Sequence, residues 1–267
     1  FGQALAIASG YYPYFNSPHH HQWTRQTKAA CSITLEGGQG QTVRSMAGAG
    51  RILAFTTNTQ YDYALGDASR AYGKQLQRFY RHVLHVRPGV FVIIDELQAP
   101  KPTRFEWRLH SLEKMQIWAE KQTVLVRRGP AQMEVRFLAP APLDFQQTDL
   151  FLPPPENGAA NQWHLTVSNV AREKETFFFT VLRPFRQGQP LPPLEPFWEG
   201  SLVGVGWTQH AVRHEVLYDP KGIRRPDLPG LPAGCRLAAV QRTKDQTTVW
   251  IPPTGGMAPS RANIDLR

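Results

Sequence analysis

The sequence predicts an all-β fold of stacked antiparallel sheets, of the β-sandwich type, with at most one or two short helices. Apolar residues recur mostly at every second position, which is the period of a strand with one buried face. The 267 residues include 21 Gly and 23 Pro, and both residue types are unfavourable inside a helix. Short apolar runs separated by Gly- and Pro-rich turns are typical of sandwiches of antiparallel strands.

Two sequence patterns identify the individual strands. Residues 105–110 alternate, so that aromatic and aliphatic side chains share one face and charged or polar side chains, His110 among them, share the other. Residues 89–95 and 176–182 are apolar runs, which suit strands buried on both faces. The only expected helix is short, at 69–78. Further strands are expected at 1–7, 31–35, 51–57, 79–87, 123–128, 132–138, 162–168, 212–217, 235–241 and 246–251.

The connections between these elements indicate one β domain over residues 1–267. Proline-rich stretches at 140–155, 184–196 and 220–232 are predicted to be surface connections rather than domain linkers. The glycine-rich stretch 37–41 lacks the Gly-Lys-Ser/Thr ending of a phosphate loop, so we expect a hairpin turn there. Asp95 and Glu96 are expected to end the strand before them and to pair with Arg81 or Arg104.

Composition excludes several classes of protein. With 41% hydrophobic residues the chain can bury a sizeable core, and no apolar stretch is long enough to span a membrane. The net charge of +9 favours an acidic partner. The basic excess is spread over three segments, without a Lys/Arg run or a nucleic-acid-binding motif, which argues against nucleic acid. Cys31 and Cys235 are predicted to be two buried thiols, with a single bridge as the alternative.

The densest group of functional residue types lies near the start of the sequence. Tyr11, Tyr12 and Tyr14 precede three consecutive histidines, His19–His21, and then Trp23 and Arg25. Tyrosine and tryptophan faces stack on sugar rings, and an arginine fork matches a carboxylate. Histidine exchanges protons near neutral pH. Together these residues suit an anionic carbohydrate.

Two other interpretations of this group remain open. In the first, Tyr11, Tyr14 and Phe15 pack the end of a sheet while the histidines lie in solvent. In the second, the histidines bind a metal ion. Neighbours in a strand point to opposite faces, so at most His19 and His21 could share one ion, and a third ligand would come from elsewhere.

Eight short segments follow one another in a recognisable order and spacing. They are Leu5–Tyr12, Asn16–His19, Arg25–Ile33, Gly37–Gln41, Gly66–Ser69, Tyr80–Val86, Val92–Leu97 and Phe105–His110. In this arrangement the chain resembles the C-terminal β-sheet domain of the heparinase II/III-like polysaccharide lyases. The match is good over residues 1–115 and fades afterwards.

The resemblance implies an enzyme of two parts. Such lyases pair an N-terminal (α/α) toroid with stacked antiparallel sheets, and the polysaccharide lies in the cleft between them. They cleave uronate-containing polymers by β-elimination, in which a base removes the C5 proton and an acid protonates the departing O4. The sequence opens at Phe1, without Met or a signal segment, so we expect a part of a longer protein whose toroid lies upstream. By family habit we expect a periplasmic or secreted location.

The resemblance also assigns candidate site residues. The family's zinc ligands match Ala8 and Ala30 here, and alanine cannot bind a metal, so we expect no family-type zinc site and no other cofactor. Tyr12 matches a tyrosine that faces the family's cleft and is the candidate catalytic residue. The candidate substrate-binding residues are Tyr11, His19, His20, Trp23 and Arg25.

Two functions from different classes follow. The first is a lyase domain that forms one wall of a cleft for acidic polysaccharide and is inactive alone. The second is a non-catalytic carbohydrate-binding or structural module derived from the same fold, which the substitutions at Ala8 and Ala30 favour. Away from this region, His110 is expected to take part in a structural network with Arg108 and Glu106.

Overall fold

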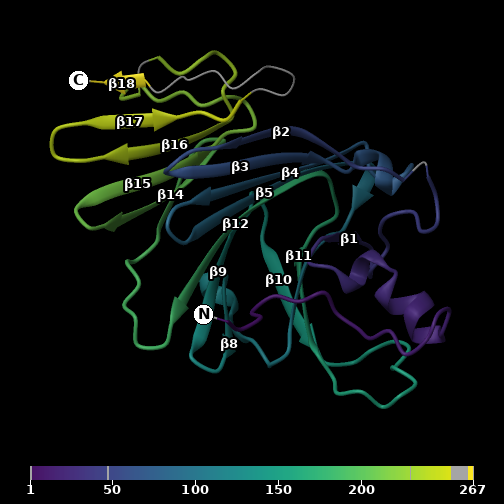
Figure 1. The fold of residues 1–267 in the computed structure, drawn as a ribbon. Coiled ribbons are helices and arrows are strands. Elements are labelled where there is room, and N and C mark those ends of the chain that lie inside the picture. Colours follow the sequence, from purple (N-terminus) through teal and green to yellow (C-terminus); the bar gives the residue numbers. More distant parts are fainter. Residues whose placement is uncertain (1, 47, 229, 254–263, 267) are drawn as a thin grey trace. The chain divides into compact units, whose positions relative to one another are not determined.

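The computed structural model describes residues 2–46, 48–228, 230–253 and 264–266. Their strands form three antiparallel sheets, which confirms the all-β prediction (Figure 1). The chain folds as two compact units, the first made of Phe1–Leu53 and Thr59–Gly188, the second of Ala54–Asn58 and Gln189–Arg267. That residues 1–267 form a single domain stays a prediction.

The first unit is a sandwich of two sheets with its core between them. The shorter sheet has the order β1 (Ile33–Leu35), β6 (Phe105–Ser111), β11 (Trp163–Asn169) and β10 (Leu143–Thr148). The longer sheet has the order β2 (Arg51–Thr57), β3 (Tyr61–Asp67), β4 (Arg78–Val86), β5 (Val90–Thr103), β12 (Glu173–Arg186), β9 (Ala131–Leu138), β8 (Thr123–Arg128) and β7 (Gln116–Trp118).

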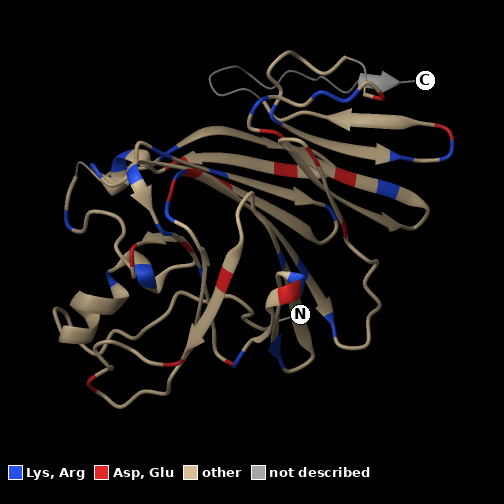
Figure 2. Cartoon of the chain, turned by 180° about the vertical axis from the view of Figure 1, so that it is seen from behind, with Lys and Arg blue, Asp and Glu red and all other residues tan. Residues whose placement is uncertain are grey.

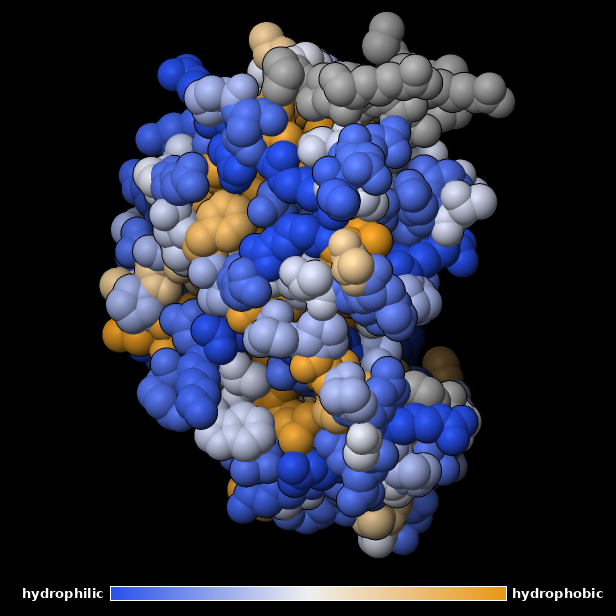
Figure 3. Space-filling view, turned by 90° about the vertical axis from the view of Figure 1, so that its left-hand side faces the viewer, coloured by the Kyte–Doolittle hydropathy of each residue, from blue (hydrophilic) through white to orange (hydrophobic). Residues whose placement is uncertain are grey.

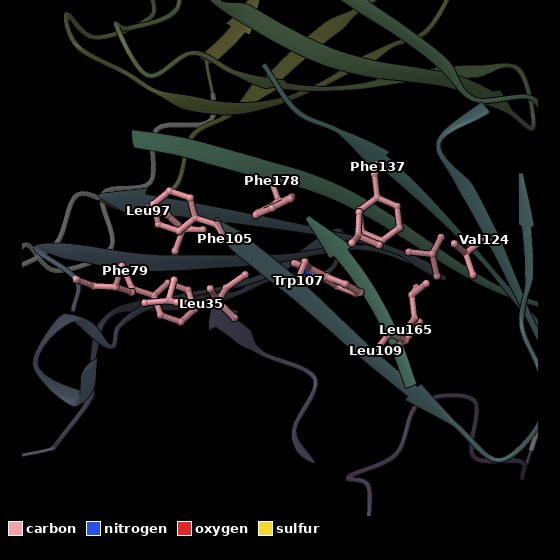
Figure 4. Packing of buried hydrophobic residues seen from close by; sticks show 14 of the residues in the cluster. Leu35, Phe79, Leu97, Phe105, Trp107, Leu109, Val124, Phe137, Leu165 and Phe178 are labelled. Carbon is pink, nitrogen blue, oxygen red and sulfur yellow. The ribbon is translucent and has the colours of Figure 1, made fainter. Parts of the chain in front are cut away.

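Aromatic residues at alternate positions fill this core. Trp107 on β6 meets Phe137 on β9 edge to face, with ring centroids 5.0 Å apart, and so links the two sheets (Figure 4). Phe105 and Phe178 are also buried in the same cluster. Burying a side chain of this size stabilises the fold by about 1.5–3 kcal/mol, so the period-two pattern of β6 directly determines which face lies inside.

The second unit contributes a six-stranded sheet with its own small core. The order is β13 (Glu195–Glu199), β14 (Leu202–Gln209), β15 (Val212–Tyr218), β16 (Leu237–Arg242), β17 (Thr247–Trp250) and β18 (Ile264–Leu266). Leu217, Ala238 and Val240 are buried in this core. Leu228 is buried there too, within the proline-rich connection 220–232, so that connection is not purely a surface loop.

Helical structure is confined to short segments: η1 (His20–Thr24) and the 3₁₀ turns η2 (Thr27–Ala29), η3 (Ser69–Tyr72) and η4 (Ala119–Lys121). The predicted helix at 69–78 is wrong beyond its first turn. Gly73 follows η3 with a φ of +58°, a left-handed conformation that ends a helix, and β4 begins at Arg78.

Three further predictions are corrected. Of the strand expected at 1–7, Phe1 lies outside the described residues, and residues 2–7 form no strand; their one backbone bond to the sheet joins the Ile7 N–H to the His110 carbonyl at 3.1 Å. Asp95 and Glu96 do not end a strand but lie buried within β5. The Asp95 charge is met as expected by Arg81, whose Nε and Nη2 donate at 2.6 and 2.9 Å. The stretch 140–155 contains the strand β10.

Several strands escaped prediction, and they share a reason. β3, β7, β10, β13 and β14 carry a glycine or proline, are only three residues long, or are rich in polar residues. These strands are determined by the hydrogen bonds and packing that neighbouring strands supply, so their own sequences carry only a weak apolar pattern.

Charge and polarity are distributed as the sequence indicated. Lys and Arg are scattered along the ribbon and interleaved with Asp and Glu (Figure 2). On the face seen in Figure 3 hydrophilic residues dominate, and hydrophobic ones form small separate groups. Cys31 is half-buried, Cys235 is buried, and both thiols are free. Within the described part of the chain, no helix is long and apolar enough to cross a membrane.

Candidate functional site

The segment that carries the candidate residues begins a helix rather than a strand. The Ser17 hydroxyl accepts the His20 N–H at 3.0 Å, as a serine does at the start of a helix. Pro18 occupies the first helical position, which its fixed φ favours. The Glu156 carboxylate accepts the His19 N–H at 2.9 Å, and this bond holds the pKa of Glu156 below its usual value.

The helix is of the π type, and this orients the three histidines differently. Arg25 N–H donates to the His20 carbonyl five residues earlier, at 3.1 Å, so η1 is wider than an α-helix. His19 and His20 point inward and are buried, whereas His21 is exposed. The expectation that these residues alternate as in a strand is therefore wrong. No three His, Cys, Asp or Glu side chains come together as a metal site in the described ranges.

A distant loop, residues 149–162, holds this segment in place. The Gly10 N–H donates to the Gln162 amide oxygen at 2.8 Å, and the Tyr11 hydroxyl donates to the Ala160 carbonyl at 2.6 Å. Gly10 has a φ of +98°, and a Cβ there would lie 2.7 Å from the ring of Trp23. Only glycine permits this close passage.

Both ring nitrogens of His19 are used inside the protein. Its Nε2 accepts the Tyr11 N–H at 3.2 Å, so the other nitrogen, Nδ1, carries the proton and donates to the Pro153 carbonyl at 2.7 Å. The side chain is fully buried. His19 therefore ties the segment to the distant loop, and in this structure it presents no atom to a ligand.

Below the segment lies a group of buried rings, which we name the ring cluster: His19, Trp23, Phe151, His164 and His110. Phe151 packs edge to face against Trp23 and His164, with centroids 5.2 and 4.9 Å apart. The Trp23 N–H donates to the Ser9 hydroxyl at 3.1 Å, and that hydroxyl lies 3.2 Å from His164 Nδ1. Trp23 is thus anchored at both its ring face and its polar edge.

Two histidines of the ring cluster face each other across neighbouring strands. His110 and His164 are directly paired in the β6–β11 register, and their Nδ1 atoms lie 3.1 Å apart. Burial, followed by the neighbouring charges, lowers the pKa of His110 to about 3 and that of His164 to about 4. Two protons between these atoms would repel each other, so the pair is neutral near pH 7. The neighbouring Arg108 and Glu106 form an ion pair at 2.7 Å.

Above the cluster lies an exposed surface, which we name the aromatic face: Tyr12, Phe15, Arg25 and Arg44. Tyr12 and Phe15 are 60% and 63% exposed and both contact the His20 ring, with centroids 4.3 and 5.8 Å away. Tyr14 is also exposed. The interpretation in which Tyr14 and Phe15 pack a sheet end is therefore wrong, and only Tyr11 packs inward, against Phe151.

Asn16 joins the two arginines of the aromatic face. Its amide oxygen accepts from Arg25 Nη1 at 3.3 Å and from Arg44 Nη2. Its own N–H donates to His20 Nδ1 at 3.0 Å, so the neutral imidazole carries its proton on Nε2. Desolvation, followed by the charges of Arg25 and Arg44, lowers the pKa of His20. Two cations are thus held beside a neutral imidazole and two exposed rings.

The structure thus divides the predicted site residues into two groups. Tyr12 and Arg25 lie on the aromatic face, and His20 lies directly beneath it. His19 and Trp23 are buried in the ring cluster, and Tyr11 contacts that cluster from above. Sequence reasoning missed Ser9, Phe151, Glu156, Gln162 and His164. Of these, only His164 had a signal in the sequence, because pairing the strands β6 and β11 places it opposite His110.

The positions implied for a zinc ion do not fit a metal. Ala8 and Ala30 are exposed and carry no donor atom. The nearby backbone is used in the fold, because Ser9 N–H donates to the Ala29 carbonyl at 2.7 Å. The residues present at these positions cannot hold zinc.

Comparisons with solved structures show proteins of the same fold. Heparan sulfate lyase HepC from Pedobacter heparinus shares 13% identity with a TM-score of 0.64, over 95% of this chain and 35% of that protein. A heparinase III shares 15% identity with a TM-score of 0.57, over 76% of this chain and 31% of that protein. The chain thus spans about a third of the length of these solved structures. No curated protein matches the sequence.

These structural likenesses show a common fold, and a sequence match shows the family. Residues 2–183 match the family described as heparinase II/III-like, C-terminal. The matched range covers most of the first unit, including the aromatic face and the ring cluster. This chain therefore belongs to the heparinase II/III-like family and corresponds to its C-terminal domain.

Proposed function

We propose that this chain forms one wall of a cleft that binds an acidic polysaccharide, in a lyase that cleaves uronate-containing polymers by β-elimination. The observation that carries the proposal is the aromatic face. Exposed rings and two arginines, joined through Asn16, lie together on a rigid base. Solved relatives of the same fold are named heparan sulfate lyase and heparinase III, which supports an acidic polysaccharide as the ligand.

Each residue of the face has a distinct role in this proposal. The rings of Tyr12 and Phe15 stack on sugar faces, and Arg25 and Arg44 contact carboxylate or sulfate groups. The Tyr12 hydroxyl exchanges a proton with the sugar at C5 or O4. His20 orients the Tyr12 ring from beneath. His19, Trp23 and Tyr11 are positioning residues, since their polar groups already bond within the protein.

The remaining catalytic groups belong to a second part of the enzyme. β-Elimination needs a base, an acid and a group that neutralises the uronate carboxylate, and the aromatic face supplies only some of these. We therefore propose an N-terminal (α/α) toroid as the partner domain, an inactive isolated chain, and a periplasmic or secreted location where such polymers are met.

Product formation tests the enzymatic part of the proposal. The chain alone, and the chain joined to its upstream region, are incubated with heparan-type and alginate-type polymers. Ultraviolet absorbance follows the unsaturated product. We expect product only from the joined protein. Absence of product on every uronate polymer would contradict the lyase assignment.

Binding by the chain alone tests the aromatic face. We expect Tyr12→Phe to lower heparan-type affinity about twofold and Arg25→Ala to lower it roughly tenfold, since a charged hydrogen bond contributes about 1.5 kcal/mol or more. The matched control is Arg127→Ala, at an exposed arginine on β8 that is not part of the aromatic face. Unchanged affinity in both variants would remove the cleft assignment.

The alternative is a non-catalytic carbohydrate-binding or structural module. The alanines at positions 8 and 30 favour it, because they remove metal-binding groups that the family resemblance implies there. The two functions differ in one readout: a module binds acidic polysaccharide with the same aromatic face, but the joined protein yields no unsaturated product.

A further inference from the structure

A polar groove of about 390 Å³ lies beside the aromatic face, on the exposed side of η1. This volume lies within the roughly 300–1,000 Å³ of ordinary small-molecule sites. Most such sites are lined by apolar side chains, whereas this one is lined only by glycine and by residues with polar side chains. They are His21, Gln22, Gln26, Lys28, Gln39 and the turn Gly37–Gly38.

The wall opposite η1 is a rigid turn. Leu35 and Gln39 exchange backbone hydrogen bonds, each at 2.8 Å, and the Gly37 N–H donates to the Glu106 carboxylate at 2.6 Å. Gly37 has a φ of +87°, and a Cβ there would meet no atom within 4 Å. The expected hairpin turn is thus present: its N–H groups are bonded within the protein, and Gly37 at its tip is exposed.

Side chains on both walls of the groove have unused bonding capacity. Among the described residues, the His21 ring and the amides of Gln22 and Gln39 have no hydrogen-bond partner in the protein. The Gln26 amide nitrogen donates to the His21 carbonyl at 2.9 Å, which leaves its oxygen and one hydrogen. Side-chain amides both donate and accept, as is needed to bind the hydroxyl groups of a sugar.

The net charge of the groove is positive. The Lys28 ammonium lies 4.9 Å from the Trp23 ring centre and donates to the Leu152 carbonyl at 3.2 Å, which leaves two of its three hydrogens. Two carboxylates among the described residues adjoin the turn, and each pairs with an arginine: Glu36 with Arg172 at 2.9 Å, and Glu106 with Arg108 at 2.7 Å. An anionic group entering the groove would therefore meet an uncompensated cation.

We propose that this polar groove binds one anionic sugar residue, with Lys28 contacting its carboxylate or sulfate and the glutamine amides contacting its hydroxyls. The inference rests on the proposed function and adds a second contact region for the same polysaccharide. Because His20 supports the aromatic face and His21 lines the groove, a single bound chain crosses η1 to reach both.

Calorimetric titration of the chain with oligosaccharides of equal length tests the inference. The ligands are a sulfated heparan-type oligosaccharide, an unsulfated oligosaccharide of glucuronate and N-acetylglucosamine, and a neutral cello-oligosaccharide. Lys28→Met keeps the apolar stem over Trp23 and removes the charge. Lys114→Met is the matched control, since Lys114 also lies over a tryptophan, Trp163, at 5.1 Å.

We expect Lys28→Met to weaken binding of acidic ligands roughly tenfold, and Gln22→Ala with Gln39→Ala to weaken it several-fold. Lys114→Met should leave affinity unchanged, and Lys28→Arg should retain most of it, which separates charge from packing. A loss restricted to the sulfated ligand identifies sulfate as the group bound, and a loss with both acidic ligands includes the carboxylate.

Three outcomes would overturn the inference. If Arg25→Ala weakens binding but the groove variants do not, the groove is no subsite and the proposed function stands. If Lys28→Met weakens binding of the neutral ligand equally, the anionic assignment fails. If the unaltered chain binds neither acidic ligand, the proposed function fails together with the groove.

Discussion

The ring cluster and the aromatic face are built from one short segment, yet they use the same residue types in opposite ways. In the ring cluster, the side chains of Trp23 and His19 are buried and have every polar group bonded. In the aromatic face, Tyr12 and Phe15 are mostly exposed and contact the His20 ring, and the Arg25 guanidinium lies over Phe15. The difference shows that one aromatic and histidine-rich segment can supply both a buried support and an exposed face.

The largest expected effect is on the stability of the ring cluster. Trp23→Ala should lower the free energy of unfolding by about 3–5 kcal/mol, because it leaves a cavity between Phe151 and His164 and removes the indole N–H bond to Ser9. Tyr14→Ala, at an exposed ring nearby, should change it by less than about 0.5 kcal/mol. Urea denaturation of both variants measures the contrast, and equal stabilities would show that the cluster is no support.

The second-largest expected effect is a loss of stability in acid, caused by the two histidines of the ring cluster. In the folded protein the pKa of His110 is about 3 and that of His164 about 4, below the ordinary 6.5. Below pH 6.5 these two histidines bind protons in the unfolded chain but stay neutral in the folded chain. Their contribution to stability is therefore fully present above pH 6.5 and decreases as the pH falls towards 4. The slope is at most about 1.4 kcal/mol per pH unit for each imidazole.

Melting temperatures between pH 7.5 and 4.5 measure this acid effect. His164→Gln should flatten the fall, although it lowers stability at pH 7.5, whereas His21→Gln, at an exposed ring, should leave the fall unchanged. A pH profile that is the same in His164→Gln and the unaltered chain would show that this histidine does not remain neutral in the folded state.

The smallest expected effect lies within the aromatic face. Asn16→Gly removes the amide that joins Arg25 and Arg44 but keeps a residue suited to the φ of +62°. We expect about a twofold loss of affinity for acidic polysaccharide, smaller than in Arg25→Ala, with an unchanged melting temperature. A loss as large as that of Arg25→Ala would instead give Asn16 a direct contact with the ligand.

Much of the sandwich was predictable because its physical cause is local. The alternation in 105–110 predicted β6 and its buried face, and the apolar run 176–182 predicted the middle of β12. Weak patterns such as that of β3 were missed, because its side chains are selected by neighbouring strands. The strand predicted at 1–7 is wrong over its described residues, 2–7, for a related reason, since an apolar stretch forms no strand without a partner along its length.

The sequence predicted which residue types form the site but not which of their side chains are buried and which are exposed. The cluster of Tyr, His, Trp and Arg was visible in residues 9–27, and of the candidates named there Tyr12 and Arg25 lie on the aromatic face. The burial of His19 was not visible, because it depends on a carbonyl 134 residues away in the sequence. His164 was missed for the same reason, since its partner His110 lies 54 residues away along the chain.

The sequence alone determined the strand content and the family resemblance, because period-two burial and the order of short segments are written along the chain. Which rings of residues 9–25 are buried in the ring cluster and which face solvent depends on the tertiary structure. That choice follows from the five-residue backbone bond of η1 and from the loop 149–162, whose contacts bury one side of the segment and leave the other open.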